Sequence, residues 1–305
     1  MIRLSIIIPH YNSVEFLAKL LYSIPEREEI QVLVVDDNST EGKREFDRLT
    51  GERSNVSAYR NLSGKNSAGI CRNIALDHAK GEWLLFADAD DYFLDGFYEV
   101  VSEYLDSEFD IVYFSPTSLD LRNGQVSNRH ESFAGLVRDY REKRDKVSEC
   151  RLRYYQEGPV SKMIRRRLVT QGQIRFDNTR VANDVMFSIK CACAAGKIEA
   201  DDREIYCITK TGGSLTMDQR EENFYTRLSV FVEKYRFLRE RLSGEEWKMT
   251  DLLGEHYIKL AKAYGLGRRG IWKVYLTFLK NRIRPCISRK WTLSYLLGKA
   301  VKGKV

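Results

Sequence analysis

The chain opens with Leu4-Ser5-Ile6-Ile7-Ile8-Pro9, a short run of mostly β-branched apolar residues that ends at a proline. Such a run predicts a buried strand, and the apolar residues spaced along 13–24 predict a helix after it. Similar apolar runs follow at Gln31–Val35 and Trp83–Ala87. Near-continuous apolar strands that alternate with helices are typical of a mostly parallel sheet flanked by helices. We therefore predict an α/β fold for the first part of the chain.

The pattern changes after a fourth predicted strand at Asp110–Ser115. Residues 159–176 and 184–195 each have a helical pattern, and the C-terminal part is helical with long charged faces. We predict a domain over residues 1–218 followed by a helical, basic extension over residues 219–305.

Charge is distributed unevenly along the 305 residues. The whole chain carries a net charge of +7, yet residues 1–255 hold 37 basic and 43 acidic side chains, and thirteen Lys and Arg follow Glu255. The net-acidic part argues against a nucleic-acid partner, because the phosphate backbone would be repelled. The basic tail instead predicts contact with an anionic surface.

Cysteines and apolar stretches bear on the compartment of the protein. The six cysteines form no Cys-x-x-Cys pair and show no spacing typical of a zinc site or a disulfide framework. The first apolar run is too short for a signal peptide, and no stretch reaches the roughly 18 to 20 apolar residues of a membrane span. We expect a cytoplasmic protein that is soluble or bound peripherally to the cytoplasmic membrane.

Three predicted strands end in polar loops: Pro9-His10-Tyr11-Asn12, Asp36-Asp37-Asn38-Ser39 and Asp88-Ala89-Asp90-Asp91. Ligands bind to open parallel sheets beyond the carboxyl ends of the strands, where such loops converge. Three Asp within four residues raise each other's pKa unless a cation is near. Hard oxygen ligands suit Mg²⁺ or Mn²⁺, which also bind nucleotide phosphates. The alternative is that these acids only cap a helix that starts near Tyr92.

Four blocks of this sequence resemble glycosyltransferase family 2. They are Ser5–Asn12, Val34–Thr40, Gly69–Ala75 and Gly81–Asp91, in the order and at the spacing of that family. The resemblance covers residues 3–115 well, residues 157–216 in part and the tail hardly at all. It implies a GT-A fold with a Rossmann-like nucleotide-sugar donor half at 1–115 and an acceptor half at 116–218. It also implies inverting sugar transfer from a nucleotide sugar, most simply a UDP-sugar.

The resemblance implies a nucleotide-sugar pocket lined by Pro9, Tyr11, Asn12, Asp37, Arg72, Asp88 and Ala89. Tyr11 is expected to place its ring against the base, and Asp37 to accept a hydrogen bond from the uracil N–H. Arg72 would hold the nucleotide, since a guanidinium group serves both base oxygens and phosphates, and Asp88 would contact the ribose or the donor sugar. The alternatives are a turn-forming role for Pro9 and Asn12, a core position for Tyr11 and a surface ion pair for Arg72.

The resemblance further implies a metal site at the third loop. Asp90 and Asp91 are expected to coordinate a divalent metal, Mn²⁺ or Mg²⁺, that neutralises the leaving diphosphate. Tyr206–Thr216 resembles the closing strand and loop of the family, so that Lys210 is predicted to pair with phosphate charge. A solvated lysine is the alternative.

The pair Asn183-Asp184 resembles the Glu-Asp pair that supplies the general base, with Asn183 in place of the first acid. Asp184 is therefore the predicted base, and the alternative is that it caps the following helix. Gly158–Arg166 resembles the segment that leads to the acceptor site, although Val160 stands where the family often has Trp. The expected acceptor is a glycan or a lipid-linked saccharide, in bacterial surface polysaccharide synthesis.

The tail predicts a basic amphipathic helix. Its predicted apolar face comprises Ile271, Tyr275, Phe278, Leu279 and Ile283, flanked by Trp272 and Trp291 and by Lys273, Lys280, Arg282 and Arg284. Such a segment is typical of helices that lie on an anionic membrane surface. The alternative is that the apolar face packs on the catalytic domain.

Two other functions compete with sugar transfer. One is a catalytically silent nucleotide-sugar or glycan-binding module, which Asn183 and the absent Trp would favour. The other is a sugar nucleotidyltransferase, which usually carries a Gly-rich phosphate loop after the first strand, where this chain has Pro9-His10-Tyr11-Asn12.

Overall fold

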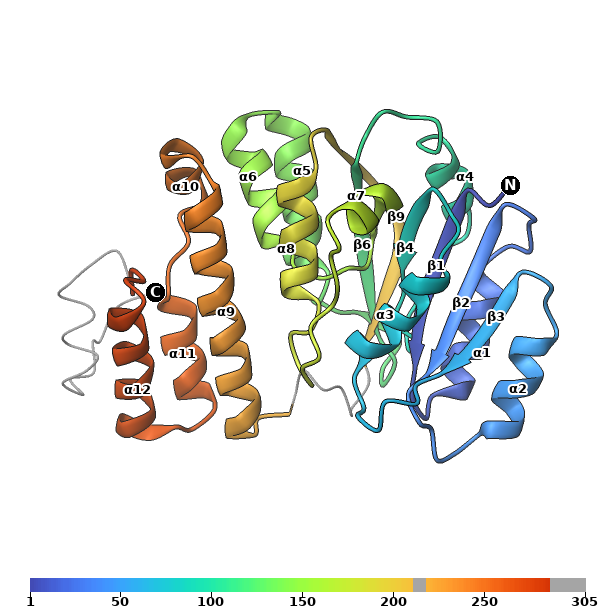
Figure 1. Cartoon of the computed structure of the whole chain (residues 1–305), viewed down its shortest axis with the longest axis horizontal. Coiled ribbons are helices and arrows are strands. Elements are labelled where there is room, and N and C mark those ends of the chain that lie inside the picture. The colour runs from blue at the N-terminus through green and yellow to red at the C-terminus, as the bar shows by residue number, and fades with distance from the viewer. Residues whose placement is uncertain (211–217, 286–305) are drawn as a thin grey trace. The chain divides into compact units, whose positions relative to one another are not determined.

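The structure is a computed structural model that describes residues 1–210 and 218–285 (Figure 1). Its contacts divide the chain into two compact units, Met1–Ser214 and Leu215–Val305. This division falls within a few residues of the boundary predicted at 218. Trp291 and the end of the predicted closing loop, up to Thr216, lie outside the described residues.

The first unit is built on one mixed sheet. Its strands are β1 (Leu4–His10), β2 (Ile30–Asp36), β3 (Val56–Arg60), β4 (Trp83–Phe86), β5 (Tyr92–Phe93), β6 (Ile111–Asp120), β7 (Gln125–Val126), β8 (Lys162–Arg165) and β9 (Ile198–Lys210). They lie in the order β3-β2-β1-β4-β8-β6-β9-β5, with β7 paired to β6. Strands β1, β2 and β4 are mutually parallel, as the apolar runs predicted, and β3, which the sequence did not predict, lies parallel to β2 at the edge of the sheet. Strand β8 runs antiparallel to both β4 and β6.

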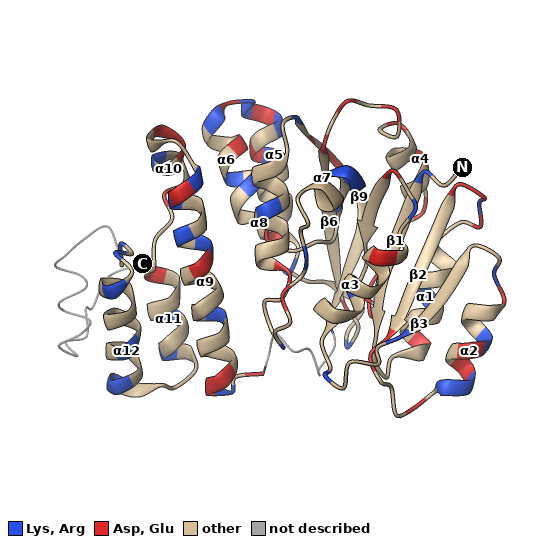
Figure 2. Cartoon of the chain, viewed as in Figure 1, with Lys and Arg blue, Asp and Glu red and all other residues tan. Residues whose placement is uncertain are grey.

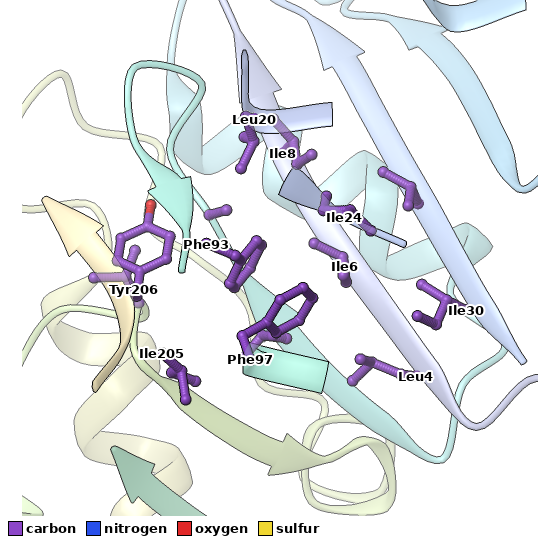
Figure 3. Packing of buried hydrophobic residues seen from close by; sticks show 14 of the residues in the cluster. Leu4, Ile6, Ile8, Leu20, Ile24, Ile30, Phe93, Phe97, Ile205 and Tyr206 are labelled. Carbon is purple, nitrogen blue, oxygen red and sulfur yellow. The ribbon is translucent and has the colours of Figure 1, made fainter. Parts of the chain in front are cut away.

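Helices cover both faces of this sheet. They are α1 (Val14–Ser23), α2 (Lys43–Gly51), α3 (Ala68–His78), α4 (Phe97–Ser102), α5 (Glu131–Lys143), α6 (Lys146–Tyr155), α7 (Arg166–Gln171) and α8 (Val185–Ala194). Alternate residues of each strand face opposite sides. Ile6 and Ile8 pack with α1, α2 and α4, whereas Ile7 packs with α3 and the layer of α5 to α8. Figure 3 shows the first of these cores, in which Phe93 and Phe97 lie between β1 and β9. The predicted α/β class is thus confirmed.

One predicted element is wrong. Residues 159–176 were expected to form a helix, but they form β8 and the short helix α7. Met163 and Ile164 of β8 are fully buried on opposite faces of the sheet, between β4 and β6. Pairing with two neighbouring strands therefore outweighs the local helical pattern.

The second unit is helical in its described part. It contains α9 (Glu221–Arg241), α10 (Gly244–Thr250), α11 (Glu255–Ala263) and α12 (Gly267–Lys280). Two residues of the predicted apolar face, Phe278 in α12 and Ile283 after it, are 1% and 4% exposed, so they face the interior of this unit and not an outer surface. Helix α12 packs on α11, and the ring of Phe278 also lies against the ring of Phe231 in α9. No helix among the described residues is both long and apolar enough to cross a membrane.

Candidate active site

The loops after β1 and β2 are joined by a buried polar network. The imidazole Nδ1 of His10 lies 3.0 Å from Asp36 Oδ1, and the Ser13 amide donates to His10 Nε2 at 3.3 Å. Nε2 is therefore the acceptor, which places the ring proton on Nδ1, where it is donated to Asp36. Burial lowers the pKa of His10, although Asp36 opposes the shift. His10 is a neutral brace that fixes the first loop.

Asn12 ties the same two loops together. Its side-chain Oδ1 accepts hydrogen bonds from the backbone amides of Thr40 and Glu41 at 2.8 and 3.2 Å. Its backbone N–H donates to Ser39 Oγ at 2.9 Å. Its backbone has φ of 45°, a left-handed conformation that Asn tolerates better than most residues. These contacts match the turn-forming alternative for Asn12. Pro9, in contrast, lies inside β1, paired in register with Val35, so the turn-forming alternative is wrong for this residue.

Asp37 and Tyr11 differ in their exposure to solvent. Asp37 is 7% exposed, and its Oδ1 accepts a 2.6 Å hydrogen bond from Asn61 Nδ2. The pKa of the Cys71 thiol in α3 is raised mainly by burial. The negative charge of Asp37 raises it further. Tyr11 is 50% exposed, so the core alternative for this residue is wrong.

The loop after β4 is held by β9. Tyr206 donates its hydroxyl to Asp91 Oδ2 at 2.9 Å and accepts the Asp88 amide at 2.8 Å, while the Thr209 amide donates to Asp91 Oδ1 at 2.7 Å. Both oxygens of Asp91 thus accept hydrogen bonds. Burial, and then the charges of Asp90 and Asp88, raise the pKa of Asp91. The helix-capping alternative is wrong, because β5 follows this loop and α4 starts only at Phe97.

Asp90 differs from Asp91 in its surroundings. Within the described residues, its carboxylate makes no hydrogen bond to another side chain, and burial followed by the charge of Asp88 raises its pKa. Arg129 opposes this shift and is held in place by a 2.6 Å hydrogen bond to the Thr209 carbonyl. Sequence reasoning missed Arg129, because it lies outside the four resembling blocks in a weakly periodic stretch. Ala89, which lies between Asp88 and Asp90 in the sequence, is buried.

Arg72 joins the third loop to the segment that carries the predicted base. The guanidinium group is buried, with Nη2 donating to Asp88 Oδ1 at 2.5 Å and Nη1 donating to Asn183 Oδ1 at 2.9 Å. It also lies over the ring of Phe176 at 5.3 Å. The surface ion-pair alternative for Arg72 is thus wrong. Its side chain connects the third loop with Asn183, which lies 111 positions after Arg72 in the sequence.

Asp184 precedes α8 but does not cap it. It occupies the N-cap position in the αR conformation, and its side chain makes no capping hydrogen bond. The capping alternative is therefore wrong. Burial raises the pKa of Asp184, the charge of Arg72 lowers it, and the charges of Asp88 and Glu157 raise it. The charges of Asp88 in the third loop and of Glu157, which precedes β8, thus both act on this carboxylate.

Lys210 ends the described part of β9. Its ammonium group lies 3.6 Å from Asp120 Oδ2, while Asp120 is bound more closely by Arg122 at 2.5 Å. Its predicted contact with phosphate stays a prediction.

The predicted metal site depends on which acidic side chains lie close enough together to bind a cation. Among residues 1–210 and 218–285, no group of three or more His, Cys, Asp or Glu side chains is placed to hold a metal ion. Magnesium-like cations are, however, often held by only one or two carboxylates, with water and substrate phosphate completing the shell. Asp88 and Asp90, each of which raises the cost of ionising its neighbours, fit such a site.

Comparison with protein families matches residues 5–171 to the glycosyl transferase family 2 model, which covers more than half of the chain. The chain belongs to glycosyltransferase family 2. The matched region contains the three loops described above and Arg72. The family membership predicted from the four blocks is thus confirmed.

Two curated relatives that match most of this chain are longer than it. Poly(ribitol-phosphate) beta-N-acetylglucosaminyltransferase TarS of Staphylococcus aureus is 26% identical over 220 residues, which are 70% of this chain and 36% of TarS. A poly(ribitol-phosphate) beta-glucosyltransferase of Bacillus spizizenii is 25% identical over 239 residues, 75% of this chain and 36% of the relative. The chain spans about a third of the length of these family members.

Solved structures support the fold. The crystal structure of residues 1–349 of S. aureus TarS in complex with UDP-GlcNAc matches with a TM-score of 0.65 and 20% identity, covering 100% of this chain and 94% of that one. A mannosyltransferase from Pyrobaculum calidifontis, solved with GDP-Man and Mn²⁺, matches with a TM-score of 0.53 and 15% identity, covering 98% and 80%. This family member therefore has the fold predicted for it.

Proposed function

We propose that this chain transfers a sugar from a UDP-sugar to a hydroxyl group of a glycan or lipid-linked acceptor, with inversion at the anomeric carbon, in the synthesis of a bacterial surface polysaccharide. Family membership supports the reaction class. The relatives are named for transfer of N-acetylglucosamine and glucose to poly(ribitol phosphate). These two sugars are the donors to test first.

The observation that carries the proposal is the buried link made by Arg72. One guanidinium group holds Asp88 of the donor loop and Asn183, the neighbour of Asp184. It therefore joins the loop that would hold the donor to the residue next to the proposed base. A displacement reaction needs the acceptor oxygen and the anomeric carbon in a fixed relation, and a buried link between these two segments supports that requirement.

Asp184 is the proposed general base. Its carboxylate is not engaged in capping α8, so it remains able to accept a proton from the acceptor hydroxyl. Its raised pKa makes it a stronger base than an ordinary carboxylate, and the charge of Arg72 helps to keep it ionised. Asp37 and Tyr11 are proposed to bind the uracil base, and Lys210 and Arg129 to face the diphosphate.

Asp90 and Asp88 are proposed to hold a divalent cation, Mn²⁺ or Mg²⁺. When bound, this cation would offset the charge that develops on the leaving diphosphate. Both oxygens of Asp91 already accept hydrogen bonds from β9, so we assign Asp91 to bracing this loop rather than to the metal.

The test is turnover of UDP-GlcNAc and UDP-glucose with Mn²⁺, first with water as acceptor and then with poly(ribitol phosphate). Release of UDP by the wild type, lost in Asp184→Asn while calorimetry still detects UDP binding, would support the proposal. Binding of UDP without turnover of any nucleotide sugar would instead favour the silent binding module.

A second proposal concerns the membrane. The outward side of α12 exposes Trp272, Leu276 and Leu279 by 48%, 57% and 60%, and these residues follow each other at helical spacing. Figure 2 shows Lys and Arg but no acidic residue on α12. An apolar stripe bordered by Lys273 and Lys280 fits the surface of an anionic bilayer, where each basic residue contributes about 1 kcal/mol.

Co-sedimentation with vesicles tests this second proposal. The full chain is expected to bind vesicles that contain phosphatidylglycerol and not those of phosphatidylcholine alone. Replacing Trp272, Leu276 and Leu279 by Ser should abolish binding, while the control Tyr22→Ser, at an exposed residue of the first unit, should not. Equal binding by the triple variant would refute the role of α12.

A further inference from the structure

Asn61 is a fully buried residue that follows β3, and each of its polar groups has a partner. Its backbone N–H donates to the Asp36 carbonyl at 2.8 Å. Its side-chain Oδ1 accepts from the Ser63 amide at 3.0 Å, whereas Nδ2 donates to the Lys65 carbonyl at 2.8 Å and to Asp37 Oδ1 at 2.6 Å. An amide N–H can only donate and a carbonyl can only accept, so these neighbours fix which end of the side chain is which. Asn61 therefore presents a donor to residue 37.

This contact decides which oxygen of Asp37 is left for a ligand. Oδ1 is occupied by Asn61. Within residues 1–210 and 218–285, Oδ2 makes no hydrogen bond beyond the weak one that the thiol of Cys71 can offer. The backbone N–H of Asp37 donates to the His10 carbonyl at 2.8 Å, so this residue is held beside the first loop, which carries Tyr11. Oδ2 is thus the oxygen that can accept a hydrogen bond from a bound base.

We infer that Asn61 is a positioning residue that sets the base preference of the donor site. The inference rests on the proposed function, which places uracil against Asp37. Because Asn61 donates toward residue 37, that residue turns an acceptor to Asn61 and leaves its other polar atom for the base. In Asp37 this second atom is also an acceptor. It matches the N3–H of uracil and opposes the unprotonated N3 of cytosine.

An amide at position 37 would reverse this match. In Asp37→Asn the carbonyl oxygen would be held toward Asn61, and the NH₂ group would be turned to the base, where it suits the N3 of cytosine. Exchanging the two residue types would restore the original match. In the double variant Asp37→Asn, Asn61→Asp, the new carboxylate would accept from the NH₂ group, and the carbonyl oxygen would again face the base.

The experiment is calorimetric titration of UDP and of CDP, each with Mn²⁺, because these nucleotides differ only at N3 and the neighbouring C4 of the base. The wild type should bind UDP at least about tenfold more tightly than CDP, and Asp37→Asn should bind CDP about tenfold more tightly than UDP. The double variant should prefer UDP again. A merely structural role of Asn61 would weaken the binding of both nucleotides alike and would not reverse their ratio.

Asn223→Asp is the matched control. Asn223 is 2% exposed in the second unit, and its Nδ2 donates to the Asp218 carbonyl at 3.3 Å. The control replaces a buried amide donor by a carboxylate, as Asn61→Asp does, and should leave the UDP to CDP ratio of the wild type unchanged. If the double variant does not fold, Asp37→Asn decides the matter alone, because it retains a hydrogen bond to Asn61.

The outcomes separate this inference from the proposed function. A wild type that prefers UDP, together with an Asp37→Asn variant that loses this preference without favouring CDP, overturns the role of Asn61 and leaves the proposed function intact. A folded double variant that still prefers CDP overturns it as well. A wild type that binds UDP no better than CDP counts against the proposed contact of Asp37 with uracil, and this inference is then overturned with it.

Discussion

Asp90 and Asp91 are adjacent in the sequence but should respond oppositely to replacement by Ala. Asp91→Ala leaves two buried donors without acceptors, the Tyr206 hydroxyl and the Thr209 amide. Each unsatisfied donor costs about 1–3 kcal/mol, so we expect a loss of at least about 2 kcal/mol. For a unit of this size that corresponds to a fall in Tm of roughly 4–8 °C.

Asp90→Ala should not lower the stability of the fold. The pKa of Asp90 is raised in the folded state, so its ionisation weakens the fold as pH rises from the usual carboxyl range through the raised pKa. Removing this carboxylate removes that cost, and no donor from another side chain loses its partner within the described residues. The variant should nevertheless lose metal-dependent binding of UDP, because Asp90 is the proposed ligand.

The assay is thermal unfolding in EDTA at pH 5 and pH 7.5, paired with calorimetric titration of UDP with and without Mn²⁺. At pH 5 the raised pKa values reduce the charge of both residues, so that the lost hydrogen bonds of Asp91→Ala dominate. The reasoning is refuted if Asp90→Ala unfolds at as low a temperature as Asp91→Ala in chelator. It is also refuted if Asp90→Ala binds UDP with Mn²⁺ as the wild type does.

Three further predictions follow from the same contacts. Asp184→Asn should lower turnover by about 10² to 10⁴-fold, measured as UDP release, with the affinity for UDP unchanged. Arg72→Met should shift the acid limb of the turnover profile to higher pH, because Arg72 lowers the pKa of Asp184 and its loss raises it; an unmoved limb would contradict this. Gly69→Ala should destabilise the first unit by about 1–3 kcal/mol in denaturant unfolding, because its Cβ would lie 2.2 Å from the Asp177 carbonyl oxygen. The control Gly135→Ala, with no neighbour within 4 Å, should be neutral or slightly stabilising.

The sequence predicted β1, β2 and β4 because these strands are buried on both faces, whereas the largely exposed edge strand β3 was not predicted. Buried parallel strands produce continuous apolar runs, and each run here ends in a polar loop at the same edge of the sheet. Strand β8 was missed because it is only four residues long, Lys162–Arg165, and three of its side chains are basic or polarisable rather than β-branched. Its conformation depends on β4 and β6, which come from distant parts of the sequence.

The roles of single polar residues were harder to predict, because they depend on contacts between segments far apart in the chain. Asp91 looks equivalent to Asp90 in the sequence, yet β9 supplies hydrogen-bond donors to Asp91 alone. Tyr206 and Thr209, which provide them, lie more than a hundred residues later. The proximity of Arg129 to Asp90 likewise could not be predicted from the sequence, because it depends on the contact of Arg129 with the Thr209 carbonyl.

The family resemblance implies an acid at the position of Asn183, and the contact of Asn183 with Arg72 offers a reason for the amide. The amide oxygen of Asn183 still accepts a hydrogen bond from Nη1, so the link between the donor loop and the base segment is kept without a second carboxylate. A carboxylate at position 183 would neutralise part of the guanidinium charge and would also repel Asp184 directly. With Asn183, more of that charge acts on Asp88 and Asp184, and the latter is costly to ionise because its partial burial raises its pKa. The substitution thus preserves the geometry while favouring the ionised form of the proposed base, and it does not by itself argue for a silent protein.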